Sequence, residues 1–402
     1  MPSVTEANFR HASYYLNLLR GANELYQQGG EALERSLATF DSERENIEAG
    51  RVWAERHSGL NDKAASLLSD AVYEGAALLG LRKRRNDRIQ ILQAALTAAR
   101  RLKDHIAEGR HLGNLGLIYI ESRDLQRGIE LLKQSLAINR ESCDQLSEAN
   151  ALVNLGAAYA ELRKPRQAIE FFEESLTVAR KIDYWRCEAG ALSNLGVIYA
   201  ELGELQRAIE FLKEALILFR KLGDRRREAE TIYNLGGFAS KEMGDWKQAI
   251  DLYEQALATF REIGDHGGQI SALNRLGLGH SRRHDRHRAI QAFEQALLIA
   301  REIEDRRAEG DTLDRLATVY IDFGDPRRAI ELSEQALSIG RQISCRSIEG
   351  IALYRKGVAL KRLGHRSKAI AHGEAALRIL EEIEDPFATK VKGIILMWTQ
   401  QM

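Results

Sequence analysis

A unit of roughly 40 residues repeats along most of this chain. Each unit carries a Leu-Gly pair, then a small residue followed by Ile, then a small residue followed by Leu. The Leu-Gly positions are Leu115-Gly116, Leu155-Gly156, Leu195-Gly196, Leu235-Gly236 and Leu276-Gly277, with the variants Leu316-Ala317 and Lys356-Gly357. A fixed period with two apolar segments in each unit predicts a solenoid of helix pairs, which presents an extended concave surface.

Prolines and glycines mark the ends of the expected helices. Pro165 and Pro326 stand where a second helix of a unit would begin, at a position that needs no backbone N–H donor. Asp325, just before the second of these prolines, is placed to cap that helix. Glycines recur where the first helices would end and predict left-handed C-caps; they are Gly203, Gly244, Gly324 and Gly364. No segment has the pattern of a strand, so the predicted fold is all-α.

The repeats divide the chain into four parts. Residues 106–385 hold seven repeats, with one inserted residue near Met243, and residues 64–105 hold a degenerate repeat. The first helix of the degenerate repeat, expected from about residue 64 to residue 81, lacks the Leu-Gly pair. Residues 1–63 do not repeat and are expected to form a helical N-terminal cap or linker. Residues 386–402 are expected to form a C-terminal capping helix.

Composition excludes several classes of protein. The chain holds 58 Lys and Arg against 58 Asp and Glu, whereas nucleic-acid-binding proteins usually carry a basic excess. No apolar stretch is long enough to span a membrane, and no signal peptide is recognisable. The 3 cysteines lie in different repeats without metal-ligand spacing. We therefore expect a cytoplasmic protein that binds neither nucleic acid nor membrane.

No motif predicts catalysis or a metal site. The chain has neither H-E-x-x-H nor G-x-S-x-G. His280 and His284 have the spacing of two helical metal ligands, but no third ligand is placed nearby. We expect a protein that is not an enzyme and that needs no cofactor and no metal.

The repeat resembles the tetratricopeptide repeat, in which Leu-Gly is followed by Tyr three residues later and by a small residue twelve after the Gly. This resemblance implies a right-handed superhelix. The 40-residue form is similar to the repeats of Pins/LGN scaffolds, of kinesin light chains and of the sensor arrays of bacterial STAND-type signalling ATPases.

The N-terminal segment also resembles part of a STAND protein. Residues 10–16, 33–34 and 43–54 are similar to the linker that follows the ATPase and winged-helix modules of these proteins, although the chain has no phosphate-binding G-x-x-x-x-G-K-[ST] loop. The resemblance implies the ligand-sensing region of such a regulator. A stand-alone scaffold or adaptor, or a peptide-pheromone receptor that controls transcription, remains as an alternative.

One position in each repeat is the candidate ligand-binding position. In the tetratricopeptide family the residue before Leu-Gly faces the concave groove; here it is first Asn and then Arg, namely Asn114, Asn154, Asn194, Asn234, Arg275, Arg315 and Arg355. An Asn amide both donates and accepts, so it can hold a peptide backbone, and Arg presents a fork that suits carboxylates. We expect a protein or peptide ligand, with an acidic segment on the Arg half. Alternatively, the Asn amides bond to adjacent helices, and the Arg side chains form salt bridges with neighbours such as Asp311 or Asp314.

Other recurring residues have structural interpretations. The tyrosines one turn after Leu-Gly are expected in the core; they are Tyr119, Tyr159, Tyr199 and Tyr320. An acidic residue opens each first helix, where it favours the helix dipole; the row is Glu108, Glu148, Glu188, Glu228, Glu309 and Glu349. The basic clusters at 82–85 and 225–227 are expected to be solvated turns, with an acidic partner as the alternative.

Overall fold

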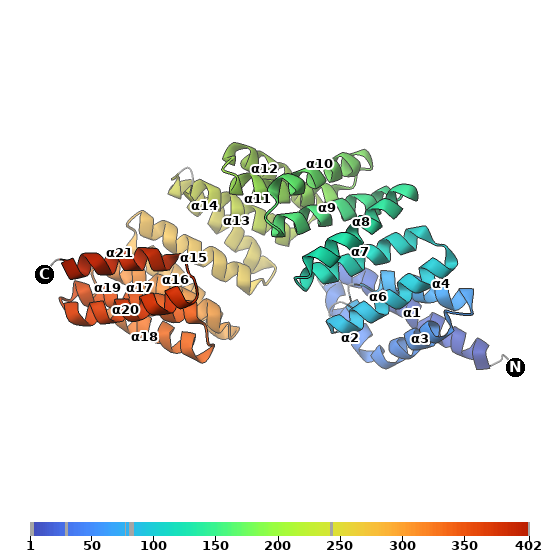
Figure 1. Cartoon of the computed structure of the whole chain (residues 1–402), viewed down its shortest axis with the longest axis horizontal. Coiled ribbons are helices and arrows are strands. Elements are labelled where there is room, and N and C mark those ends of the chain that lie inside the picture. The colour runs from blue at the N-terminus through green and yellow to red at the C-terminus, as the bar shows by residue number, and fades with distance from the viewer. Residues whose placement is uncertain (1–3, 29–30, 77, 80–83, 242–243, 401–402) are drawn as a thin grey trace. The chain divides into compact units, whose positions relative to one another are not determined.

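A computed structural model describes residues 4–28, 31–76, 78–79, 84–241 and 244–400. Every regular element in these described ranges is an α-helix. The helices group into two compact units, residues 1–202 and 203–402, and each unit has its own stack of helices (Figure 1). The position of the inserted residue near Met243 lies outside the described residues.

Unit 1 begins with helices that do not belong to the repeats and continues with antiparallel pairs. Its helices are α1 (Val4–Gln28), α2 (Glu31–Ser42), α3 (Arg44–His57), α4 (Asp62–Glu74), α6 (Arg85–Leu102), α7 (His105–Glu121), α8 (Leu125–Glu141), α9 (Gln145–Glu161), α10 (Pro165–Lys181) and α11 (Trp185–Glu201). α1 packs against α2, α3 and α4, and Leu16, Phe40 and Leu68 are buried in their shared core. α4 ends at Glu74 rather than near residue 81, and Gly75 caps it; residues 77 and 80–83 lie outside the description.

Unit 2 begins with one helix, continues with helix pairs and ends with one more helix. Its helices are α12 (Leu205–Leu222), α13 (Arg225–Lys241), α14 (Trp246–Glu262), α15 (His266–Arg282), α16 (Arg286–Glu302), α17 (Arg306–Asp322), α18 (Pro326–Gln342), α19 (Arg346–Arg362), α20 (Arg366–Glu382) and α21 (Phe387–Gln400). α21 packs on α20, where Val391, Ile395 and Trp398 are buried.

The Leu-Gly pair sits where the two helices of a pair approach most closely. We call the odd-numbered helices from α7 to α19 first helices and the even-numbered helices from α8 to α20 second helices. Leu155 is fully buried, and a Cβ added at Gly156 would lie only 2.6 Å from the ring of Phe172 on the next helix. The small residue therefore allows close packing, which explains why the sequence repeats it.

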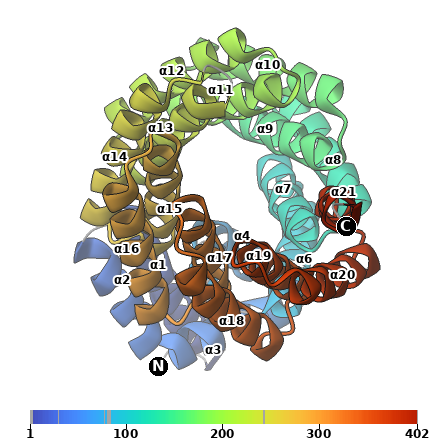
Figure 2. The ribbon, with the colours of Figure 1, turned by 90° about the vertical axis from the view of Figure 1, so that its left-hand side faces the viewer.

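First helices lie on the inner side of each unit. Neighbouring first helices contact one another directly, as α7 does with α9 in unit 1 and α17 does with α19 in unit 2. Figure 2 shows α13, α15, α17 and α19 on the inner side of α14, α16, α18 and α20. The inner face of each unit is therefore built from first helices, and we use the term in that sense below.

The turns have the geometry that the sequence predicts. Pro165 and Pro326 open second helices, and the Asp325 side chain accepts a hydrogen bond from the Arg328 N–H at 3.2 Å. Gly203, Gly244, Gly324 and Gly364 have φ values of 81°, 63°, 84° and 84°, so the expected left-handed caps are confirmed. Non-glycine residues adopt this conformation at several other turns, among them Asp183 and Ser344.

The acidic residue that opens a first helix is in most repeats held by an arginine from the preceding helix. Arg Nε donates to Glu Oε1 at 2.7–2.9 Å in five turns; the pairs are Arg100–Glu108, Arg140–Glu148, Arg180–Glu188, Arg220–Glu228 and Arg301–Glu309. Burial acts to raise the pKa of Glu309, but hydrogen bonds from Arg301 and Arg306 outweigh it and hold that pKa below its usual value. Each of these pairs joins two consecutive helices.

Candidate functional site

The structure places the seven candidate residues on the inner faces of their units. Asn114, Asn154 and Asn194 lie on α7, α9 and α11 of unit 1, and Asn234, Arg275, Arg315 and Arg355 lie on α13, α15, α17 and α19 of unit 2. All are half-buried except Arg315, which is exposed. Six of these positions precede a buried Leu, and Arg355 precedes the half-buried Lys356.

The asparagine amides have no hydrogen-bond partner among the described residues, on any of the four first helices. Asn114 lines a pocket of about 220 Å³ with Leu117 and with Arg88, which is bonded to Glu121 at 3.0 Å. Asn234 lines another of about 400 Å³ beside Tyr233. Donor and acceptor groups on these amides are thus open to a ligand that enters from the inner face.

The three arginines differ in what already holds them. Arg275 Nε donates to the Tyr233 hydroxyl at 3.1 Å. The Arg355 guanidinium donates twice to Asp314, with Nε 2.9 Å from Oδ1 and Nη2 3.4 Å from Oδ2. Burial acts to lower the pKa of Arg355, but the Asp314 carboxylate outweighs it and raises that pKa. Arg355 therefore already has the salt bridge that the sequence left open as its alternative role.

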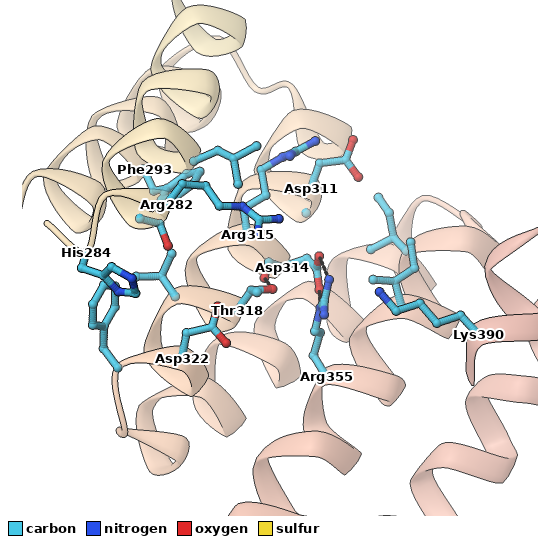
Figure 3. A pocket seen from close by; sticks show the side chains of 17 residues that line it. Arg282, His284, Phe293, Asp311, Asp314, Arg315, Thr318, Asp322, Arg355 and Lys390 are labelled. Carbon is cyan, nitrogen blue, oxygen red and sulfur yellow. Dashed lines mark hydrogen bonds and ion pairs between the residues drawn. The ribbon is translucent and has the colours of Figure 1, made fainter. Parts of the chain in front are cut away.

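A pocket of about 720 Å³ lies on the inner face of unit 2, between α15, α17 and α19, with one residue each from α16 and α21. Figure 3 shows Asp314 and Arg355 joined inside it, with Asp311 and Asp322 to either side of this pair in that view. Apolar side chains complete the wall; they are Leu278, Phe293, Val319, Phe323, Ile348 and Ile351. The pocket offers charged groups of both signs beside an apolar surface.

Arg315 is the member of the arginine row whose guanidinium makes no hydrogen bond or ion pair with a described residue. Arg315 is the largest charged influence on the pKa of Asp311, which lies one turn earlier on α17. Asp311 is in contact with solvent, yet the surrounding inner face removes enough water to raise its pKa, although Arg315 acts to lower it. These two groups are available to a ligand.

Several pocket residues were missed by the sequence analysis. Asp322 and Thr318 follow Asp311 and Arg315 along α17 at helical spacing, so they share one face of that helix. This spacing was readable from the sequence. Arg282, at the end of α15, and Lys390, on α21, reach the pocket only through the packing of their helices, which no short-range pattern encodes.

The remaining sequence interpretations can be placed on the structure. Tyr159 and Tyr199 are buried, while Tyr119 and Tyr320 are half-buried under the guanidinium groups of Arg127 and Arg286. The cluster at 225–227 is engaged in ion pairs with acidic neighbours in its own unit. Of the cluster at 82–85, residues 82 and 83 lie outside the described residues, and Arg84 and Arg85 are exposed. Among the described residues, no group of three or more His, Cys, Asp or Glu side chains could hold a metal ion.

None of the described helices is long and apolar enough to cross a membrane. His280, one of the two histidines singled out from the sequence, is buried, and this burial lowers its pKa. His284 lines the 720 Å³ pocket at its α15 side.

Comparison with known families gives one match. A family model described as "Tetratricopeptide repeat" matches residues 110–181, 187–262, 227–302 and 268–342, more than half of the chain. No curated protein sequence matches.

Solved structures similar to this chain share its fold at low sequence identity. The Signal Transduction ATPase with Numerous Domains (STAND) protein PH0952 from Pyrococcus horikoshii, which has a tetratricopeptide repeat sensor, is 15% identical with a TM-score of 0.66; the similarity covers 95% of this chain and 65% of that one. The apo quorum sensor NprR from B. thuringiensis is 15% identical with a TM-score of 0.58, over 94% of this chain and 100% of that one. A Rap protein complexed with Competence and Sporulation Factor is 16% identical with a TM-score of 0.53, over 95% and 99%.

Proposed function

The chain belongs to the tetratricopeptide repeat family, and on that basis we propose that it is a non-catalytic domain that binds a protein or peptide segment on its inner faces. One observation carries this proposal. The inner face of unit 2 holds a 720 Å³ pocket whose lining includes the unpaired Arg315 beside apolar side chains. Pockets of this size and mixed character are typical of ligand sites.

The asparagine row supports the same proposal for unit 1. Asn114, Asn154 and Asn194 recur at one repeat spacing on adjacent first helices, and their amides have no described protein partner. An extended peptide presents alternating N–H and C=O groups that such amides can satisfy. Each hydrogen bond would contribute only about 0.5–1.5 kcal/mol net, so useful affinity needs several of them together.

The domain is proposed to act as the ligand-sensing region of a STAND-type signalling regulator. In support, its fold is similar to the repeat-sensor STAND protein over nearly all of this chain, while the chain spans 65% of that protein's length. Binding would then bias the regulator between two states. A ligand shifts such an equilibrium only by the difference in its affinity for them.

A peptide-pheromone receptor that controls transcription is the alternative that a specific observation favours. The quorum sensor NprR and the Rap protein complex are similar in fold over 94% and 95% of this chain. The two proposals differ in their ligand, because the receptor would bind a short free peptide and the STAND sensor can bind a folded partner. A stand-alone scaffold or adaptor would bind a partner without any attached switch.

An affinity pull-down from the lysate of the source organism tests inner-face binding. The test variant combines Asn154→Ala, Asn194→Ala and Arg315→Glu. A matched control makes the same kinds of change at exposed positions of second helices, with Gln167→Ala, Gln206→Ala and Arg327→Glu. We expect a partner retained by the wild type and the control but lost by the test variant. Retention of every partner by a folded test variant would place binding elsewhere.

A further inference from the structure

One face of α17 presents charged groups of both signs to the 720 Å³ pocket. Asp311, Asp314, Arg315 and Asp322 follow one another at intervals that keep them on neighbouring rows of the helix. Arg282 at the end of α15 and Lys390 on α21 add two further cations. The charge pattern of this pocket therefore depends on which of these groups neutralise one another.

Asp314 forms a salt bridge with Arg355. Two hydrogen bonds, at 2.9 and 3.4 Å, join them, and the exposed fractions of their side chains are only 18% and 24%. A charge-assisted pair in this geometry is stronger than a single neutral hydrogen bond. Arg355 is consequently a poor receptor for an anionic ligand group, because such a group would first have to displace Asp314.

The other charged groups remain separate. Asp311, Asp322, Arg282, Arg315 and Lys390 make no hydrogen bond or ion pair with a described residue, and the Lys390 ammonium lies 5.6 Å from the centre of the Phe387 ring. Carboxylates and cations thus line one cavity without a direct ion pair between them. A ligand that carries both signs would satisfy both sets, whereas a purely acidic ligand would meet repulsion from Asp311 and Asp322.

We propose that this pocket selects an amphoteric peptide segment, with a basic and an acidic side chain flanking an apolar one, and that Asp314 sets this specificity by occupying Arg355. The acidic side chain binds Arg315 or Lys390, and the basic side chain binds Asp311 or Asp322. The apolar residue packs on the pocket wall near Val319. This inference rests on the proposed function and refines it, since it replaces a general acidic preference with a mixed one.

Binding of labelled peptides tests the proposal. Five capped, fluorescein-labelled peptides share Gly flanks and differ in their central triplets, which are Lys-Leu-Glu, Glu-Leu-Lys, Glu-Leu-Glu, Lys-Leu-Lys and Gln-Leu-Gln. Fluorescence anisotropy on the wild-type chain should show one amphoteric peptide binding about tenfold tighter than the acidic, basic and neutral ones. Arg315→Gln and Asp311→Asn, both at solvent-exposed positions, should each remove most of that advantage.

Asp314→Asn tests the specificity role directly. By releasing Arg355, it should raise affinity for the acidic peptide about tenfold or more. The double variant Asp314→Asn/Arg355→Gln should lose that gain, and Arg327→Glu on α18 is the control for a remote charge change. Circular dichroism confirms that each variant is folded; if Asp314→Asn does not fold, Arg315→Gln and Asp311→Asn still decide the charge preference.

The outcomes separate the two proposals. Preferential binding of the acidic peptide by the wild type, or an unchanged preference in folded Asp314→Asn, would overturn the amphoteric selection while leaving peptide binding intact. Failure of all five peptides to bind at millimolar concentration would count against both the selection and the use of this pocket as a peptide site. In that case the inner-face pull-down still decides the proposed function independently.

Discussion

Arg355 and Asp314 occupy facing positions on two neighbouring first helices, 41 residues apart in sequence and 2.9 Å apart between Nε and Oδ1. The three arginines occupy equivalent positions in the sequence repeat, but their bonding partners differ. Arg275 is bonded to a tyrosine hydroxyl, Arg355 is held by a carboxylate, and Arg315 makes no such contact with a described residue. The chemistry of the inner face depends on these neighbours as much as on the row itself.

Breaking the Arg355–Asp314 pair should destabilise unit 2. Asp314→Asn leaves a largely buried guanidinium without its counter-ion, and we expect a loss of roughly 1–3 kcal/mol. Arg355→Gln combined with Asp314→Asn should cost less than the sum of the single changes, because no unpaired charge remains. Chemical denaturation of the four proteins gives this double-mutant cycle. Additive losses would show that the two side chains do not interact in solution.

Stability should fall in mild acid because of His111. This imidazole is fully buried on α7, its Nε2 lies 2.8 Å from the Ser69 hydroxyl, and burial lowers its pKa from 6.5 to about 4. The folded state thus holds the neutral ring, while the unfolded chain takes up a proton below pH 6.5. The contribution of neutral His111 to the free energy of unfolding is fully present above that pH. The free energy of unfolding should fall by roughly 2–4 kcal/mol as pH drops from 6.5 to 4.

Denaturant midpoints measured across that range, for the wild type and for His111→Gln, isolate the effect from other titrating groups. The glutamine keeps an amide within reach of Ser69 but cannot be protonated. Its pH profile should be flatter than that of the wild type. Parallel profiles would mean that His111 is already accessible to protons in the folded protein.

Two turns of unit 2 make a matched test of backbone strain. Gly324 and Ser344 both have positive φ, at 84° and 54°, and Gly324 has no atom within 4 Å of an added Cβ. Ser344→Gly should stabilise the unit by about 1 kcal/mol, and Gly324→Ala should destabilise it by about 1–2 kcal/mol, since only the backbone conformation is at issue. Thermal unfolding is the readout. Equal effects of the same sign would contradict the assigned turn geometry.

Close packing of the helix pairs predicts opposite effects of alanine at two helical glycines. A Cβ at Gly277 would lie 2.6 Å from the Phe293 ring, whereas one at Gly393 on α21 would meet nothing within 4 Å. Gly277→Ala should cost roughly 1–3 kcal/mol through overpacking. Gly393→Ala should gain up to about 1 kcal/mol through higher helix propensity. Denaturation midpoints of both variants check the contrast, and a tolerated Gly277→Ala would place the helices farther apart.

The fold was predictable because the same helix-pair pattern recurs many times in the sequence. Leu155, Gly156 and their equivalents mark the contact between the two helices of each repeat. Gly324 marks a turn with a positive φ, which glycine adopts more easily than other residues. Where one copy is irregular, the prediction was less good. The helix expected to run to residue 81 ends at Glu74 with Gly75 as its C-cap, and residues 76, 78 and 79 are helical again.

The candidate site was predictable only in part. The helix period places Asn234, Arg315 and Arg355 on inner faces, but their partners come from side-chain packing between helices. Tyr233 and Asp314 precede their arginines by 42 and 41 residues, about one repeat, so a search at that spacing would have suggested both contacts. The contribution of Lys390 depends on how α21 packs, which the repeat pattern does not specify.

Site-specific photo-crosslinking tests the central claim, that the inner face of unit 2 binds the ligand. A benzophenone amino acid replaces Arg282, an exposed residue that lines the pocket, or Leu298, an exposed residue of the second helix α16. After irradiation in the lysate of the source organism, we predict a discrete adduct from position 282 that Arg315→Glu abolishes, and none from position 298. An adduct from position 298 with none from position 282 would contradict the account.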